Sequence, residues 1–251
     1  MSLQAFRFKR FSVAQEGAAH PVGTDAVLLG AWADVQGVTR FLDIGTGTGV
    51  VALMVAQRLS AGKNWKGLGV EIHPISASLA RSNFAASPWA HQLEVLEGPI
   101  QQFSGSNGHS VQEPFRETYD LIVSNPPFFS ELTVSPDKTR SLGRHTASLS
   151  PGDLLVAVGQ LLAPKGRFCV VLPTLEGRRL CELAVPEGLY WTKIVEIRSR
   201  PDKPVERLLM QFEKSPYGIQ RETLCLFAEG SGNHYSIEFQ EMTRDFYLAG
   251  T

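Results

Sequence analysis

The sequence predicts an α/β protein built on a doubly wound, mostly parallel sheet. Short apolar runs alternate with segments of helical periodicity along most of the chain, as expected when crossover helices join parallel strands. Turn-forming residues, mainly glycine and proline, separate most of these segments. In the last third of the chain, strand-like runs follow one another without a helix between them, so the sheet is expected to finish with an antiparallel C-terminal edge.

The alternation can be followed element by element. The expected strands are short, rich in β-branched residues and bounded by turn residues, whereas the expected helices carry apolar residues at helical spacing. The strands are residues 41–44, 67–70, 93–96, 119–124 and 167–172, and the helices are residues 50–59, 74–86, 154–162 and 175–185. Pro74 suits the first turn of its helix, and residues 150–153 resemble a capped helix start. Residues 164–166 are expected to end the third helix.

Beyond residue 173 the pattern changes from alternating elements to consecutive strands. Strands are expected at residues 191–198, 205–212 and 222–228, and the proline-bearing connection 199–204 suits a hairpin loop. Residues 104–116 are rich in glycine, serine and asparagine, which predicts a flexible surface loop.

The composition predicts a soluble protein with one sizeable core. The chain has 251 residues, of which 43% are hydrophobic. Apolar runs fall short of the ~18 residues needed to span a bilayer, and no charged-then-apolar leader opens the chain, so we expect no membrane partner and a cytoplasmic location. The three cysteines are an odd number without close spacing, which suggests neither a disulfide framework nor a metal site. We expect a monomer.

The motif Asn125-Pro126-Pro127-Phe128 directly follows the expected strand 119–124. Two consecutive prolines fix the backbone and remove two N–H donors, so the strand cannot continue. The resulting rigid loop presents an amide side chain, a proline carbonyl and an aromatic ring. Two acceptors and a ring face are the groups needed to hold a planar amine. On these residues alone, a tight turn without function remains the alternative.

A glycine loop joins the first expected strand to helix 50–59. Gly45, Gly47 and Gly49 let the backbone approach a ligand, and the helix start behind them offers free N–H groups. This is not the G-x-G-x-x-G dinucleotide fingerprint, because the third glycine comes one residue early. Glu71 ends the next strand, roughly 20 residues on, where an acid accepts hydrogen bonds from ribose hydroxyls. A solvated strand end is the alternative for Glu71.

The order of these motifs, from Asp43 to Gly49, then Glu71, then Asn125 to Phe128, resembles the S-adenosylmethionine-dependent amino-methyltransferases. Further segments resemble the bacterial valine-tRNA adenine-37 N6-methyltransferases over nearly the whole chain. These segments are residues 23–32, 42–49, 87–90, 124–128, 168–173 and 246–248. The resemblance implies a Rossmann-like class I methyltransferase fold, S-adenosyl-L-methionine as cofactor, and methyl transfer to the N6 amine of adenine-37 in valine tRNA.

The resemblance also implies a single methyltransferase domain over residues 1–251. Residues 1–39 would be an N-terminal extension that shapes the cofactor and substrate site, and residues 40–251 would be the catalytic core.

The resemblance assigns roles to the candidate cofactor residues. The glycines would carry the methionine part, Asp43 would orient their loop or meet the methionine amino group, Glu71 would take the ribose, and Thr24 and Asp25 would wall the pocket. The family usually holds the cofactor's adenine amino group with an acid after the third strand. Here Pro99 stands at that position, and Glu97 is a poor substitute for it. A nearby backbone contact and weaker cofactor binding are the two alternatives.

The resemblance places catalysis in the Asn-Pro-Pro-Phe loop. The Asn125 side-chain oxygen and the Pro126 carbonyl would accept the two N–H bonds of the exocyclic amine, favour a pyramidal nitrogen and aim its lone pair for in-line transfer. Pro127 would keep the loop rigid, and Phe128 would stack on the extruded base, an interaction of roughly 1–3 kcal/mol. No strong general base is required, because the nitrogen's proton becomes acidic once it carries a fourth substituent.

The protein has a net charge of −1, whereas enzymes that bind nucleic acid usually carry an excess of basic residues. Its basic residues are nevertheless clustered along the chain. The expected tRNA-binding residues are Arg7, Lys9 and Arg10, which alternate with phenylalanines, and Arg140, Arg144 and His145, which follow the catalytic loop. A third basic group lies within residues 193–207. A solvated face is the alternative for each group.

Three other functions remain open at this stage. A protein glutamine N5-methyltransferase would grip its amide with the same loop, although only about 40 residues precede the first strand, too few for the helical domain expected of such an enzyme. A DNA adenine methyltransferase is disfavoured because no insertion is large enough for a target-recognition domain. A non-catalytic cofactor- or RNA-binding module would explain Pro99, but the intact motif from Asn125 to Phe128 argues against it.

Overall fold

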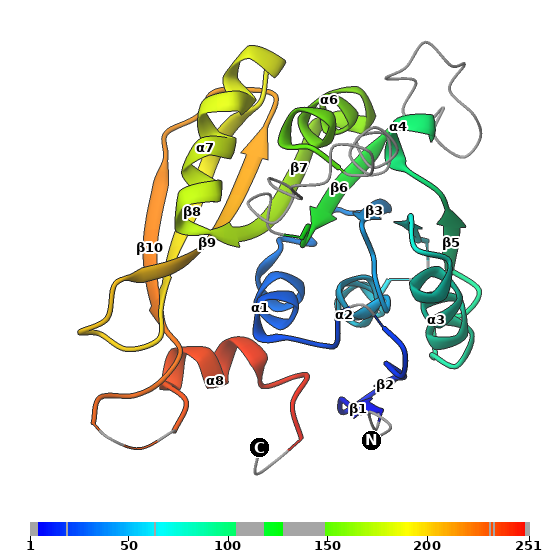
Figure 1. The fold of residues 1–251 in the computed structure, drawn as a ribbon, viewed down its shortest axis with the longest axis horizontal. Coiled ribbons are helices and arrows are strands. Elements are labelled where there is room, and N and C mark those ends of the chain that lie inside the picture. The colour runs from blue at the N-terminus through cyan, green and yellow to red at the C-terminus, as the bar shows by residue number, and fades with distance from the viewer. Residues whose placement is uncertain are drawn as a thin grey trace, which may run out of the picture.

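The computed structural model describes residues 5–18, 20–62, 64–103, 118–127, 149–230, 232 and 234–248. In this part of the chain an eight-stranded sheet is covered by helices on both faces (Figure 1). The strands are β3 (Arg40–Ile44), β4 (Lys66–Glu71), β5 (Leu93–Glu97), β6 (Tyr119–Ser124), β7 (Leu162–Pro173), β8 (Tyr190–Arg198), β9 (Val205–Glu213) and β10 (Gln220–Cys225). A separate hairpin consists of β1 (Phe6–Arg7) and β2 (Ser12–Val13).

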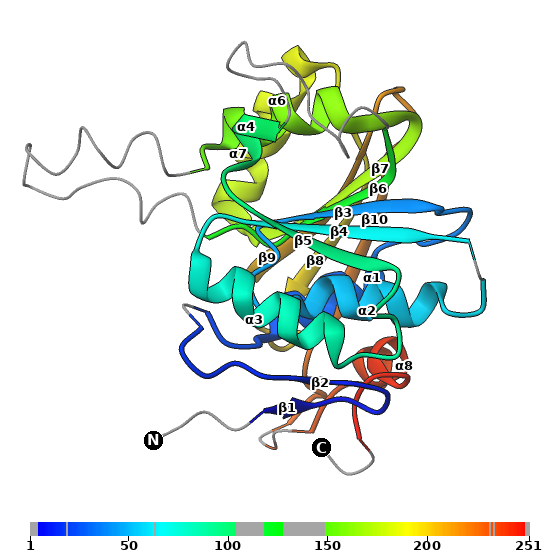
Figure 2. The same ribbon diagram turned by 90° about the vertical axis from the view of Figure 1, so that its right-hand side faces the viewer.

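The helices fall into two layers around this sheet. They are α1 (Thr24–Trp32), α2 (Val50–Leu59), α3 (Pro74–Ala85), α4 (Ile100–Phe103), α6 (Pro151–Leu161), α7 (Thr174–Ala184) with the short 3₁₀ helix η2 (Val185–Glu187), and α8 (Ile237–Thr243). Figure 2 shows α1, α2 and α3 on one face and α4, α6 and α7 on the other, with the β1–β2 hairpin and α8 packed outside the first layer.

The strand order is β10-β8-β9-β7-β6-β3-β4-β5. The pairs from β7 through β6, β3 and β4 to β5 are parallel, which confirms the mostly parallel, Rossmann-like α/β sheet. The antiparallel pairing lies in the C-terminal half, as expected, and belongs to β9, which runs against both β7 and β8. The outermost strand β10 is parallel to β8.

Two apolar clusters hold the layers together. Side chains of one strand alternate between them: Val123 of β6 belongs to the cluster under α1 and α2, whereas Ile122 belongs to the cluster under α6 and α7. The first cluster also contains Leu53 of α2, and the second Leu155 of α6. Because both faces are buried, the central strands read as nearly continuous apolar runs in the sequence.

Two predicted details were wrong or incomplete. Residues 164–166 do not end a helix; α6 already ends at Leu161, and these residues lie within the longer β7. Gly166 fits there because a Cβ atom would come within 2.8 Å of the Tyr119 carbonyl oxygen. Helix α1 was not predicted, because residues 26–30 are all buried and therefore show no polar face. The loop expected at residues 104–116 lies outside the described residues.

Candidate active site

The glycine loop leaves β3 at the carboxyl edge of the sheet. Gly45, Gly47 and Gly49 have φ angles of 72°, 57° and 85°, a left-handed backbone that favours glycine. A Cβ atom on Gly45 or Gly47 would meet nothing within 4 Å, so these two residues border open space that a ligand can occupy. A Cβ atom on Gly49 would lie 2.5 Å from the Phe84 ring. Gly49 therefore lets α2 pack against α3.

Asp43 lies beneath this loop rather than facing the open space. Its side chain is 1% exposed, and its Oδ2 accepts hydrogen bonds from Thr46 Oγ1 at 2.7 Å and from the Ala52 backbone N–H at 3.2 Å. Burial raises the pKa of Asp43 to about 7, against the lowering effect of these two hydrogen bonds, and the nearby charge of Glu71 adds to the increase. The contacts fit a residue that orients the loop and the start of α2.

Glu71 connects the end of β4 to the glycine loop. Its Oε2 accepts a hydrogen bond from the Gly47 backbone N–H at 2.8 Å, and its Oε1 accepts one from the His73 N–H at 2.8 Å. The residue is only 6% exposed. A carboxylate oxygen has a second lone pair, so both oxygens can accept a further hydrogen bond from a ribose hydroxyl.

The end of β5 provides no substitute acid for Pro99. Glu97 is paired in register with Glu71, but its side chain is 41% exposed and forms an ion pair with Arg81 at 3.3 Å. Gly98 takes a φ of 143° and donates its N–H to the Glu71 carbonyl oxygen at 2.9 Å. The chain therefore turns at Gly98, and the Glu97 carboxylate is directed to Arg81.

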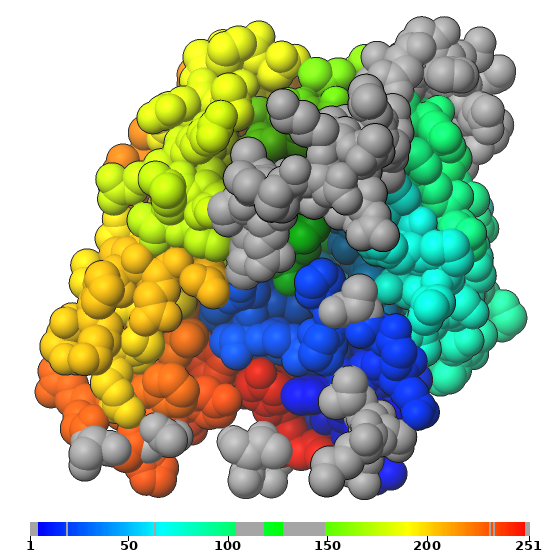
Figure 3. Space-filling model, in the orientation of Figure 1, coloured from blue at the N-terminus to red at the C-terminus, as the bar shows by residue number. Residues whose placement is uncertain are grey.

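The Asn-Pro-Pro segment lies next to the glycine loop. Ile44 of β3 and Ser124 of β6 are register partners on adjacent strands, and the Ser124 hydroxyl donates a hydrogen bond to the Ile44 carbonyl oxygen at 2.8 Å. The following residues, Gly45 and Asn125, thus leave neighbouring strand ends that are about 4.8 Å apart. Asn125 is half-buried. Figure 3 shows green atoms from the end of β6 in a hollow beside the blue atoms of the N-terminal segment.

The two prolines differ in their surroundings. Pro126 is buried, whereas Pro127 is exposed. Phe128, the expected stacking residue, lies outside the described residues.

Thr24 and Asp25 form the first turn of α1, and Asp25 contacts Arg207 of the third basic group, for which RNA contact and a solvated face were the two alternatives. Arg207 of β9 donates its Nε–H to Asp25 Oδ2 at 2.9 Å, and the two side chains are 32% and 25% exposed. Because Arg207 is the register partner of Pro173, this ion pair lies at the carboxyl edge, two strands from β6. Thr24 is exposed.

The N-terminal basic residues lie elsewhere. Arg10 donates to Ser60 Oγ at 2.9 Å and stacks over Trp89 at 5.5 Å, Lys9 donates to the Arg244 carbonyl oxygen, and Arg7 is exposed. Ser60 caps the C-terminus of α2, a helix about 15 Å long whose other end is the glycine loop. The structure thus separates these residues from Asn125, and their contact with tRNA stays a prediction.

The other basic groups are either outside the described residues or already engaged. Arg140, Arg144 and His145 lie outside the described residues. In the third group, Arg200 donates to the carbonyl oxygens of Ala228, Gly230 and Gly232, and Lys193 forms an ion pair with Glu222 at 3.0 Å. The Arg200 and Lys193 side chains thus bind groups of the protein itself.

Among the residues that the structure describes, no group of three or more histidine, cysteine or acidic residues could hold a metal ion. In the same part of the chain, no helix is long and apolar enough to cross a bilayer.

Comparison with known proteins decides the family. Residues 23–172 match the family model described as the methyltransferase small domain. The chain belongs to this family. The methyltransferase is 40% identical over 248 residues to the tRNA1(Val) (adenine(37)-N6)-methyltransferase of Bacteroides fragilis, a match that covers 99% of each chain. It is also 40% identical to the protein of the same name from Yersinia enterocolitica, over 97% of this chain and 92% of that one.

A solved structure supports the fold of the methyltransferase. The protein Atu636 from Agrobacterium tumefaciens, described as a predicted O-methyltransferase, aligns with a TM-score of 0.62 over 88% of this chain and 96% of that chain. At 18% sequence identity, this likeness bears on the fold alone. The family inferred from the sequence motifs is confirmed by the matches to the family model and to the full-length relatives.

Proposed function

We propose that this methyltransferase uses S-adenosyl-L-methionine to methylate the N6 amine of an adenine in tRNA, at adenine-37 of valine tRNA. The observation that carries the proposal is the position of Asn125 and Pro126 beside the glycine loop, on the adjacent ends of β6 and β3. The full-length relatives named for this reaction support the choice of substrate.

The residues around the glycine loop fit the proposed cofactor. Gly45 and Gly47 leave space for its methionine part, and the Glu71 carboxylate has lone pairs for its ribose hydroxyls. Asp43 fixes the loop through Thr46 and Ala52. When bound, the cofactor supplies a methyl group that its sulfonium has already activated, so the protein's task is positioning and electrostatics.

Asn125 and Pro126 would orient the attacking nitrogen. An exocyclic adenine nitrogen is a weak nucleophile because its lone pair is delocalised into the ring. If the Asn125 side-chain oxygen and the Pro126 carbonyl oxygen accept hydrogen bonds from its two N–H groups, the nitrogen becomes pyramidal and its lone pair points toward the methyl donor. The extra proton then leaves to solvent without a strong general base. Phe128 is proposed to stack on the base.

The chain would act as one methyltransferase domain, with residues 1–39 forming an extension that shapes the site. It would work as a cytoplasmic monomer with tRNA as partner, and Arg7, Lys9, Arg10, Arg140, Arg144 and His145 would contact the RNA backbone.

The test is methyl transfer from labelled S-adenosylmethionine to bacterial tRNA that lacks the modification, followed by mass spectrometry of the digested nucleosides. N6-methyladenosine that disappears with Asn125→Ala would support the proposal. The variant should still bind S-adenosylhomocysteine with an affinity close to that of the wild-type protein. No label in RNA, with cofactor binding intact, would refute tRNA as the substrate. Label found on a glutamine side chain of a protein would indicate a protein glutamine methyltransferase instead.

A further inference from the structure

Asn83 is a buried amide on α3 that joins two distant segments of the chain at the glycine loop. Its Nδ2 donates to the Thr48 carbonyl oxygen at 2.8 Å and to the Ala14 carbonyl oxygen at 3.0 Å, and its Oδ1 accepts from the Ala14 N–H at 2.8 Å. The residue is only 4% exposed. Thr48 lies within the glycine loop, so a single side chain holds both this loop and the N-terminal segment.

The segment that follows Ala14 closes on itself beside the proposed ribose site. The Val22 N–H donates to the Gln15 side-chain oxygen at 3.0 Å, which ties the ends of residues 15–22 together. Gly17, within this segment, is near the first turn of α3, since a Cβ atom on it would lie 3.8 Å from Ile75. That turn begins three residues after Glu71. Figure 2 shows the segment between β2 and α1 passing by this end of α3.

We propose that Asn83 is a positioning residue that holds residues 14–18 and 20–22 as one wall of the cofactor site and couples the order of that segment to cofactor affinity. The inference rests on the proposed function, because it takes S-adenosylmethionine as the ligand of the glycine loop. A ligand that restrains the loop around Thr48 also restrains the Asn83 amide, which in turn restrains Ala14. By thermodynamic linkage, a change that disorders the segment must weaken ligand binding by the same coupling free energy with which the ligand orders the segment.

The structure offers a matched control for the loss of a buried amide. Gln57 on α2 is 7% exposed, and its Nε2 donates to the Asp245 carbonyl oxygen at 2.8 Å, so it also ties a helix to a segment distant in sequence. Gln57 lies toward the opposite end of α2 from the glycine loop. Gln57→Ala should therefore lower stability without changing the cofactor site.

The experiment measures hydrogen exchange of residues 14–22 and calorimetric affinity for S-adenosylhomocysteine in the full-length protein. In the wild-type protein, the ligand should slow exchange in this segment at least about tenfold. Asn83→Ala should remove that protection and weaken binding about tenfold or more, whereas Gln57→Ala should change affinity less than twofold. With saturating cofactor, kcat of Asn83→Ala should stay within about threefold of the wild-type value while KM for the cofactor rises.

Ala14→Pro provides a second variant if Asn83→Ala does not fold, because it removes the N–H donated to Asn83 Oδ1 and should weaken affinity severalfold. Bound ligand that leaves exchange of residues 14–22 unchanged in the wild-type protein would overturn the inference. Equal affinity in Asn83→Ala and Gln57→Ala would overturn it as well. If the wild-type protein fails to bind the ligand at millimolar concentration, the proposed function fails with it, so the two failures are distinguishable.

Discussion

Asp43→Asn is expected to stabilise the fold increasingly as the pH rises. Burial raises the folded-state pKa of Asp43 from its ordinary 3.8 to about 7. Between these two values the folded protein keeps a proton that the unfolded chain has lost, so ionisation of Asp43 makes unfolding easier as pH increases. Asparagine cannot ionise, and its side-chain oxygen can still accept the hydrogen bonds from Thr46 and Ala52.

The size of the effect follows from the difference between the two pKa values. A difference of about 3 pKa units corresponds to about 4 kcal/mol of unfolding free energy at alkaline pH, at about 1.4 kcal/mol per unit. At pH 5 the linkage relation gives a penalty of about 1.7 kcal/mol, because pH 5 lies only about 1.2 units above the unfolded pKa of 3.8 while the folded carboxyl keeps its proton. The stability difference between Asp43→Asn and the wild-type protein should therefore grow by about 2.5 kcal/mol from pH 5 to pH 8.

Urea unfolding followed by tryptophan fluorescence at several pH values measures this difference directly. Asp120→Asn is a control of opposite sign. Burial favours the neutral form of Asp120, but hydrogen bonds donated by Thr39 and Arg40 outweigh it and lower its pKa. Its stabilising effect is thus present above its ordinary pKa and is lost as pH falls. A pH-independent difference for Asp43→Asn, or one that shrinks toward pH 8, would refute the reasoning.

Three other substitutions test the site. Gly49→Ala should lower the unfolding free energy by about 2–4 kcal/mol through its φ of 85° and its 2.5 Å approach to Phe84; a melting temperature equal to that of the wild-type protein would contradict this. Glu71→Gln should weaken binding of S-adenosylhomocysteine at least about tenfold in calorimetry, because the new amide N–H₂ would face a backbone N–H that now donates to a carboxylate oxygen. Unchanged affinity would argue against a contact between Glu71 and the ribose. Asp25→Asn should cost about 1 kcal/mol in urea unfolding, since its pair with Arg207 is partly exposed, and the loss should fade at high salt.

Much of the fold could be predicted because its signals are local. The bounds of residues 50–59 and 119–124 agree with α2 and β6, because Gly49 marks the start of the first apolar run and Asn125-Pro126 the end of the second. Helix α8 was missed, because its seven residues carry too short a pattern. The order β7-β9-β8 depends on pairing between distant strands, which local patterns do not encode.

The candidate site was predictable only in part. Its glycine loop, Glu71 and Asn125 follow strand ends, so their shared edge could be expected from the parallel topology. Asn83 could not be found in this way, because its partners lie 69 and 35 residues away. The buried residues of its helix also include Ser76, so a polar residue among them did not single out Asn83. The role of Arg200, in the basic group within residues 193–207, could not be predicted either, because the carbonyl oxygens of Ala228 and Gly232 to which it donates lie 28 and 32 residues away.

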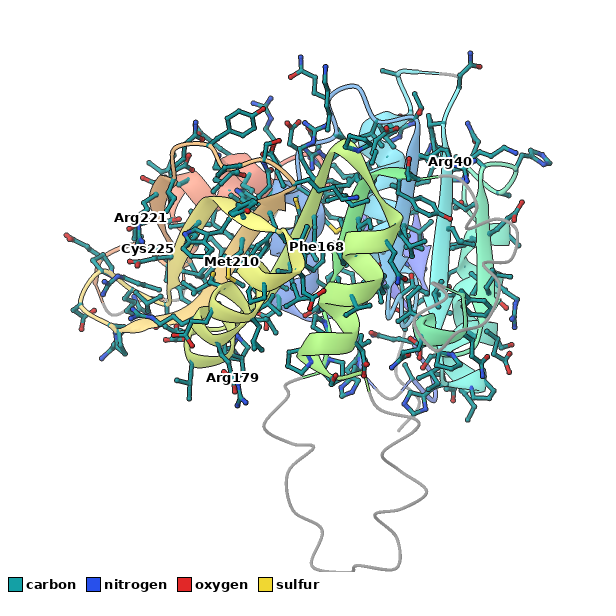
Figure 4. All side chains as sticks on the ribbon, turned by 90° about the horizontal axis from the view of Figure 1, so that it is seen from above. Arg40, Phe168, Arg179, Met210, Arg221 and Cys225 are labelled. Carbon is teal, nitrogen blue, oxygen red and sulfur yellow. The ribbon has the colours of Figure 1, made fainter. Side chains whose placement is uncertain are left out.

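The outer strand β10 has a consequence for the protein's behaviour at high concentration. An edge strand has unpaired backbone groups that can join the sheet of a second molecule. Residues 220–223 of β10 are glutamine, arginine, glutamate and threonine, all exposed, and Figure 4 shows Arg221 at this margin. Opposite charges on neighbouring positions, with no large apolar side chain among the four, disfavour stacking of sheets into aggregates. The molecule thus ends its sheet with a strand that resists further β-pairing.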